Sequence, residues 1–137
     1  MEVGPGTAIP EWRLERVDPE KMKLLAAIMR DPNTIHWDRA EVARRGLGER
    51  VVNQGPTNLG YVINMLIAWA GPTCLRGLSA RFTSNVFDED SVVAGGVVTG
   101  VRDEGGERVA DCEIWLDRAD GTRAVAGTAT VTLPAGS

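Results

Sequence analysis

Residues 55–72, GPTNLGYVINMLIAWAGP, hold the longest apolar stretch of the chain and decide its fold. The pair Gly55-Pro56 predicts a helix start, because proline is favoured in the first helical turn. The pair Gly71-Pro72 predicts an abrupt helix end. Apolar residues between the two pairs point to nearly every side of a helix. We therefore expect a helix that is buried all round rather than one lying on a surface.

The segments before this helix predict a short strand and two further helices. Residues 8–16 have the pattern of a strand, and Asp18 has the position of a helix cap. The helix that follows is expected to stop at Pro32, since proline disfavours helical geometry at the residue before it. A second helix, opened by Asp38, is expected over residues 38–46.

The segments after the apolar helix alternate with period two, which is typical of strands. Turn residues separate four such runs, at residues 76–87, 91–103, 107–118 and 122–133. One helix enclosed by a five-stranded antiparallel sheet satisfies this order of elements. This is the hot-dog architecture, an α+β fold, and we expect one such domain over residues 1–137. A free sheet edge and an open helix face predict a dimer.

Composition excludes several classes of function. The 137 residues are 43% hydrophobic and 25% charged, which is typical of one globular domain. A net charge of −4 without clustered lysine or arginine argues against nucleic-acid binding. Two cysteines and one histidine lack metal-ligand spacing, so we expect no metal site. Without a secretion signal or a membrane-length apolar run, we expect a cytoplasmic protein that binds no membrane.

The segment DPNTIH (31–36) contains the only histidine and is the first candidate for chemistry. On a continuous helix Asp31 and His36 would point about 140° apart, because each residue turns ~100°. Pro32 breaks the helix, so both side chains can converge from one loop. A carboxylate and an imidazole together can hold one water molecule and move two protons. A helix-ending aspartate and a structural loop histidine would explain the same residues.

The start of the apolar helix is the second candidate. The free N–H groups at a helix N-terminus bind anions, and here they would include the amide of Gly55. Such an amide could stabilise the enolate-like charge that develops on a thioester carbonyl. Asn53 and Gln54 lie just before the helix, where they could line a pocket or simply satisfy backbone groups.

The sequence resembles the MaoC-like dehydratases, also called hydratase 2. Their usual motif reads Gly-Asp-x-Asn-Pro-Ile-His-x-Asp, and residues 31–40, DPNTIHWDRA, are similar to it. The positions in register are Asp31, Asn33, Ile35, His36 and Asp38. Residues 53–55 occupy the family's Ala-His-Gly turn, and residues 81–92 resemble a second family motif. The departures are Arg30 for glycine, Thr34 for proline, Gln54 for histidine, Asn85 for proline and Glu89 for glycine.

This resemblance implies an (R)-specific enoyl-CoA hydratase, read equally as a 3-hydroxyacyl-thioester dehydratase. Asp31 and His36 would be the catalytic pair, with His36 as base toward water and Asp31 as acid toward C2. The Gly55 amide would polarise the thioester carbonyl. Substrate or loop contacts would come from Asn33, Asn53 and Gln54. No metal or redox cofactor is implied, and CoA or phosphopantetheine would serve as a handle on the substrate.

The stretch from His36 to residues 69–72 looks closest to small actinobacterial members of the family. These include hydratase subunits acting on steroid side-chain enoyl-CoA esters and dehydratases of mycolic-acid synthesis, several of them heteromeric. A homodimer or a heterodimer with a second hot-dog subunit is therefore expected. Alternatives are an acyl-carrier-protein dehydratase subunit of fatty-acid or polyketide synthesis, a non-catalytic acyl-binding subunit, and a structural dimer. A hot-dog thioesterase is disfavoured, because helix residues 56–70 contain no Asp or Glu.

Overall fold

The computed structural model describes residues 2–136 and contains the elements expected from the sequence. In chain order they are β1 (Ala8–Leu14), α1 (Pro19–Met29), the short 3₁₀ helix η1 (Thr34–His36), α2 (Arg39–Arg44), α3 (Gly55–Ala70), β2 (Leu75–Phe82), β3 (Val92–Glu104), β4 (Glu107–Arg118) and β5 (Arg123–Thr132). The expected α+β hot-dog fold, a sheet packed around one central helix, is confirmed.

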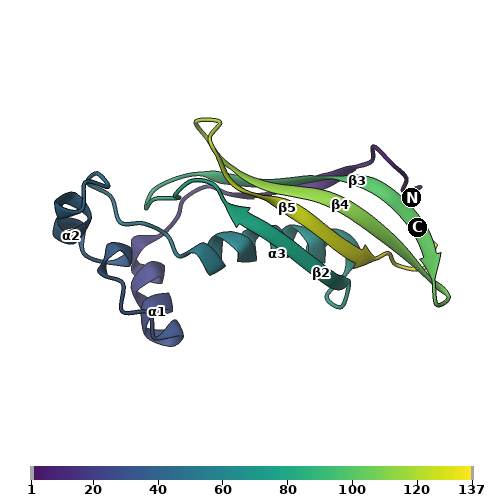
Figure 1. Ribbon diagram of the computed structural model, residues 1–137, viewed down its shortest axis with the longest axis horizontal. Helices are drawn as coiled ribbons and strands as arrows, with labels where there is room; N and C mark the ends of the chain where they lie inside the picture. Colours follow the sequence, from purple (N-terminus) through teal and green to yellow (C-terminus); the bar gives the residue numbers. More distant parts are fainter. Residues whose placement is uncertain (1, 137) are drawn as a thin grey trace.

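The sheet has the strand order β1-β3-β4-β5-β2, and every neighbouring pair is antiparallel. It curves over α3, while α1 and α2 stand beyond one end of the sheet and both chain termini lie at the other (Figure 1). The edge strands β1 and β2 each pair with a single neighbour. The helical end therefore carries the loops that follow α1 and α2, and the candidate residues lie in these loops and at the start of α3.

The hydrophobic core lies between α3 and the concave face of the sheet. Helix α3 contacts all five strands, and its residues Val62, Met65 and Leu66 are fully buried. The period-two pattern of β4 sends alternate side chains toward the helix, namely Ala110, Cys112, Ile114 and Leu116. The alternation predicted from the sequence is thus the alternation that fills the core.

The prediction that α3 is buried all round is wrong for the single chain. Ile67 is 38% exposed, and Asn64 and Ala68 are also exposed. The physical reason is geometric, because one curved sheet covers only one side of a helix. The apolar residues on the other side lie open to solvent in the isolated chain.

Some element boundaries also differ from the sequence prediction. Strand β1 stops at Leu14, and α2 spans six residues, shorter than the expected 38–46. Strand β2 ends at Phe82 rather than at residue 87. There the amide of Thr83 donates to the carbonyl of Ala124 at 2.9 Å, and the chain leaves the sheet edge. Residues 83–91 consequently form a loop that reaches back toward the helices.

The end of α1 fixes where the candidate loop begins. Arg30 has a left-handed backbone with φ 52° and ψ 40°, and the amide of Asp31 donates to the carbonyl of Ala26 at 3.0 Å. This is the hydrogen-bond pattern in which glycine commonly ends a helix. The helix stops before Pro32 as predicted, and Asp31 becomes the first residue of the loop.

Replacing Arg30 by glycine is therefore expected to stabilise the chain. A left-handed conformation strains residues with a Cβ, and relief of this strain outweighs the greater flexibility of glycine in the unfolded state. We expect the free energy of unfolding to rise by about 0.5–1 kcal/mol. Denaturant unfolding measures the change. The control is Arg45→Gly, because Arg45 ends α2 with φ −83° and should gain nothing from glycine. A less stable Arg30→Gly variant would contradict the left-handed backbone conformation assigned to Arg30.

Gly127 of β5 is expected to tolerate no side chain. A Cβ at this position would lie 2.0 Å from the carbonyl oxygen of Ser79 and 2.7 Å from the Cα of Ala80, both in β2. Gly127→Ala must displace β2 and should lower the free energy of unfolding by about 2 kcal/mol or more. Gly77→Ala on β2 is the matched control, since a Cβ there meets no atom within 4 Å. Equal stability of the two variants in thermal unfolding would refute the close approach of β2 to Gly127.

Candidate active site

Asp31 and His36 converge, as the sequence hypothesis requires. Asp31 follows the end of α1, and His36 is the last residue of η1. Asp31 Oδ2 lies 3.2 Å from His36 Nε2. The intervening loop is held by side chain to backbone hydrogen bonds, from the Asn33 amide to Asp31 Oδ1 at 3.0 Å and from the Ile35 amide to Asn33 Oδ1 at 3.4 Å. The tight turn thus makes the two side chains face each other.

A backbone carbonyl fixes the orientation of the His36 ring. The side chain is buried, and Nδ1 lies 2.6 Å from the carbonyl oxygen of Val52. Because a carbonyl only accepts hydrogen bonds, Nδ1 carries the proton. In the neutral ring, Nε2 then presents its lone pair to Asp31. The amide of Val52 donates in turn to the carbonyl of Ile35 at 2.8 Å, which ties the two segments together.

This arrangement places two acceptors opposite each other. A carboxylate oxygen and an imidazole lone pair 3.2 Å apart are satisfied only by a shared proton or by a water molecule that donates to both. Solvent reaches the pair from the aspartate side, because the Asp31 side chain is 27% exposed. The site can therefore hold a transferable proton and is accessible to water.

Gly55 is the first residue of α3, and the side chain of its cap residue makes no capping hydrogen bond. Within residues 2–136, the Gly55 amide has no hydrogen-bond partner. A Cβ at this position would lie 3.3 Å from Cζ of Phe82, so the aromatic ring covers the helix start. A free amide beside an aromatic ring is a suitable donor for a carbonyl oxygen.

Asn53 lines a cavity at the start of α3. The cavity measures about 280 Å³ and lies between β1, α1 and α3. Asn53 Nδ2 donates to Asn58 Oδ1 at 2.8 Å and to the Tyr61 hydroxyl at 3.1 Å. Tyr61 stacks on Trp12 with ring centroids 5.5 Å apart. Burial raises the pKa of Tyr61, so its hydroxyl stays protonated near neutral pH and can donate to a ligand.

A second cavity of about 290 Å³ adjoins the first and shares Leu25, Thr57 and Tyr61 with it. Pro56 and Met29 line this second cavity. Together the two spaces form an apolar groove between α1 and α3. The groove lies next to the start of α3, where the Gly55 amide is located.

Gln54 and Asn33 lie outside both cavities. Gln54 is fully buried, and its Nε2 donates to the carbonyl of Met22 at 2.8 Å, which attaches α1 to the start of α3. Asn33 Oδ1 caps η1 and accepts from Arg45 Nη1 at 3.3 Å. Of the two roles expected for Asn33, the geometry fits orientation of the loop.

Sequence reasoning missed three contributors to this region. Val52 orients His36 through its backbone carbonyl, and no sequence pattern predicts such a contact. Trp12 lies in a strand without a motif, and Tyr61 has the spacing of a core residue. No group of three or more His, Cys, Asp or Glu in residues 2–136 is placed to hold a metal ion. In the same described part, no helix is long and apolar enough to cross a membrane.

The comparison with known families agrees with the resemblance inferred from residues 31–40. Residues 5–113 match the family model described as "MaoC like domain". The chain belongs to the MaoC-like family. No curated protein matches the chain significantly.

Solved structures of MaoC-like proteins and hydratases share this fold. The ChsH1–ChsH2 complex from Mycobacterium tuberculosis contains a chain that is 25% identical with a TM-score of 0.81, and the alignment covers 98% of this chain and 100% of that chain. The (R)-hydratase from A. caviae involved in PHA biosynthesis is 28% identical with a TM-score of 0.78, covering 98% of each chain. The HadBC (3R-hydroxyacyl-ACP dehydratase) complex from M. tuberculosis, 14% identical, has a TM-score of 0.69 over 96% of this chain and 98% of that chain. This last likeness concerns the fold alone.

Proposed function

We propose that the chain catalyses (R)-specific addition of water across the C2–C3 double bond of a trans-2-enoyl thioester, and the reverse dehydration. The observation that carries the proposal is the facing pair Asp31 and His36, with the ring anchored on Val52. Membership of the MaoC-like family and similarity to the (R)-hydratase from A. caviae support it.

The pair can perform the addition with a balanced transfer of protons. In the resting site, one proton is shared between Asp31 Oδ2 and His36 Nε2. As the oxygen of the bound water bonds to C3, one water proton passes to Nε2, and the proton held on Asp31 passes to C2. Transfer of the Nε2 proton across the 3.2 Å gap to Asp31 then restores the site. His36 is thus the base toward water and Asp31 the acid toward C2.

The start of α3 supplies the electrostatic part of the reaction. Negative charge develops on the thioester oxygen as water adds, and the Gly55 amide is the proposed donor to that oxygen. The acyl group would lie in the groove between α1 and α3, against the Trp12 and Tyr61 rings. The step moves only protons, so the proposal includes no metal or redox cofactor. The CoA or phosphopantetheine arm acts as a handle.

The proposed working unit is a pair of hot-dog subunits. Strand β2 has one free edge, and α3 leaves Ile67 and its neighbours exposed, so a second subunit could extend the sheet and cover the helix. The partner is either a second copy of this chain or a different hot-dog chain. Light scattering of the chain alone, and mixed with candidate partners, distinguishes the two assemblies by mass.

The activity is tested by loss of the enoyl-thioester absorbance. Purified protein is added to crotonyl-CoA, to one bulky enoyl-CoA and to the corresponding acyl-carrier-protein thioester. The proposal expects an absorbance decrease with at least one of them and a product of (R) configuration at C3 on chiral chromatography. An (S) product, or no decrease with any substrate for the assembled protein, would contradict it. The preferred handle distinguishes the CoA hydratase from the carrier-protein dehydratase.

A further inference from the structure

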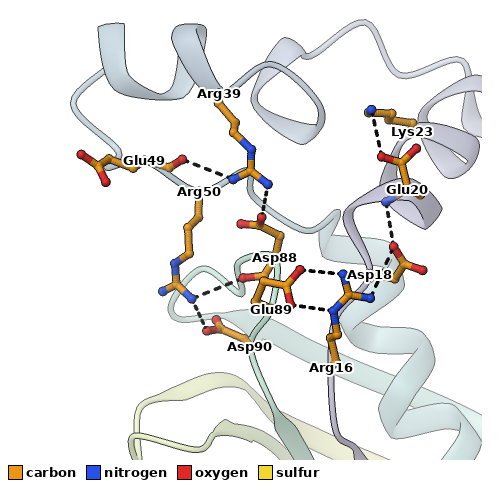
Figure 2. Close-up of polar contacts among 10 residues, drawn as sticks. All are labelled: Arg16, Asp18, Glu20, Lys23, Arg39, Glu49, Arg50, Asp88, Glu89 and Asp90. Carbon is orange, nitrogen blue, oxygen red and sulfur yellow. Dashed lines mark hydrogen bonds and ion pairs between the residues drawn. The ribbon is translucent and has the colours of Figure 1, made fainter.

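The loop of residues 86–90 connects parts of the chain that surround the candidate site. Three arginines form ion pairs with the acidic residues of this loop, each from a different segment (Figure 2). Arg39 of α2 binds Asp88, Arg50 binds Asp90, and Arg16, two residues after the end of β1, binds Glu89. No step of the proposed reaction uses these ion pairs.

Asp88 differs from the other acids of this loop because it is buried. It is 1% exposed, whereas the Glu89 side chain is 51% exposed. Asp88 Oδ2 lies 2.5 Å from Nη2 of Arg39, and Asp88 Oδ1 has no partner within the described residues. Burying a carboxylate costs free energy that a single partner rarely returns, so stability alone is a poor explanation for this residue.

Backbone contacts continue from Asp88 to His36. The amide of Asp88 donates to the carbonyl of Val51 at 3.0 Å, and Phe87 forms an antiparallel bridge with Val52. Val52 is the residue whose carbonyl lies 2.6 Å from His36 Nδ1. The loop of residues 86–90 therefore holds the backbone of Val51 and Val52, and with it the Val52 carbonyl that orients the His36 ring.

The side chain of Asp88 is also linked, through Arg39, to the segment that follows His36. Arg39 begins α2 three residues after His36, and its guanidinium also donates to the carbonyl of Glu49 at 3.4 Å. Arg39 and Asp88 thus join the chain after His36 to the segment that carries Val52. Figure 2 shows this link above the exposed pair of Arg16 and Glu89.

We propose that Asp88 is a positioning residue that keeps the His36 Nδ1–H on the Val52 carbonyl, so that Nε2 faces Asp31. Only its kinetic consequence rests on the proposed function, because the orientation of the ring can be measured without turnover. Asp88 touches neither Asp31 nor His36 and takes no part in proton transfer.

The test compares four variants. Asp88→Asn keeps the shape of the side chain and removes its charge. Arg39→Gln removes the cation that pairs with Asp88 by changing a side chain that is half-exposed. Arg39→Lys keeps a cation beside Asp88 and is the conservative rescue. Glu89→Gln is the matched control, because it breaks an ion pair of the same loop that does not lead to Val52. Circular dichroism and thermal unfolding identify the folded variants, and if Asp88→Asn is unfolded, Arg39→Gln decides.

The readout is the imidazole ¹⁵N spectrum of His36, the only histidine in the chain. For wild type, Arg39→Lys and Glu89→Gln we expect the shifts of a ring protonated at Nδ1. For Asp88→Asn and Arg39→Gln we expect averaging of the two ring nitrogens and a roughly tenfold to hundredfold lower kcat with KM within about twofold. Wild-type ring shifts in both folded variants would overturn the proposal. If the His36 ¹⁵N shifts change in Asp88→Asn and Arg39→Gln but the protein has no hydratase activity, the proposed function is refuted and the positioning role stands.

Discussion

Asp31→Asn is expected to lower kcat for enoyl-thioester hydration by about 10³-fold, within the range for loss of a general acid or base. The amide keeps the shape of the carboxylate and can still accept from the backbone of Asn33, so the loop should stay folded. It cannot hold and release the proton that the reaction delivers to C2. Loss of enoyl-thioester absorbance under saturating substrate measures the change.

A neighbouring acid provides the control. Asp38 lies in the same motif, but its carboxylate caps α2 through the amides of Ala40 and Glu41. Asparagine is an equally good cap, so Asp38→Asn should keep kcat within about threefold. If Asp31→Asn kept wild-type kcat, Asp31 would not be the acid, whereas equal losses in the two variants would point to a general effect on the loop.

His36→Ala is expected to lower kcat by about 10²–10⁴-fold, because the base toward water is removed. The vacated space lies against the Val52 carbonyl, which is a ready acceptor for an added imidazole. We expect added imidazole to restore part of the activity in a concentration-dependent way. Kinetics with and without imidazole measure this rescue.

The specificity of that rescue is its own control. Imidazole should not rescue Asp31→Asn, because that variant retains its histidine, and an equal-sized ring without a basic nitrogen should not rescue His36→Ala. An active His36→Ala enzyme without added imidazole would contradict the assigned base.

The fold could be predicted from the sequence because its signals are local. Pro32 ends α1, glycine and proline bound α3, and the alternation of β4 places one face toward the core. The all-round burial of α3 could not be judged this way, because an apolar helix face does not reveal whether a sheet or a second subunit covers it. The end of β2 at Phe82 depends on its pairing with β5, and the paired residues Phe82 and Val125 lie far apart in sequence.

The candidate site was predictable in part for the same reason. Asp31 and His36 lie in one short motif, and Pro32 explains how they converge. Gln54 was expected in the pocket but attaches α1 to the start of α3, because its Nε2 donates to the carbonyl of Met22. The role proposed for Asp88 leaves no local signal, since its contacts join segments 37 to 49 residues away.

The central claim is that Asp31 and His36 act as one unit. The most direct measurement compares kcat/KM for enoyl-thioester hydration in wild type, Asp31→Asn, His36→Ala and the double variant. Residues that act together give non-additive losses. The account predicts that the double variant is within about threefold of the slower single variant. A double-variant loss equal to the product of the two single losses would show that the residues act independently and would contradict the account.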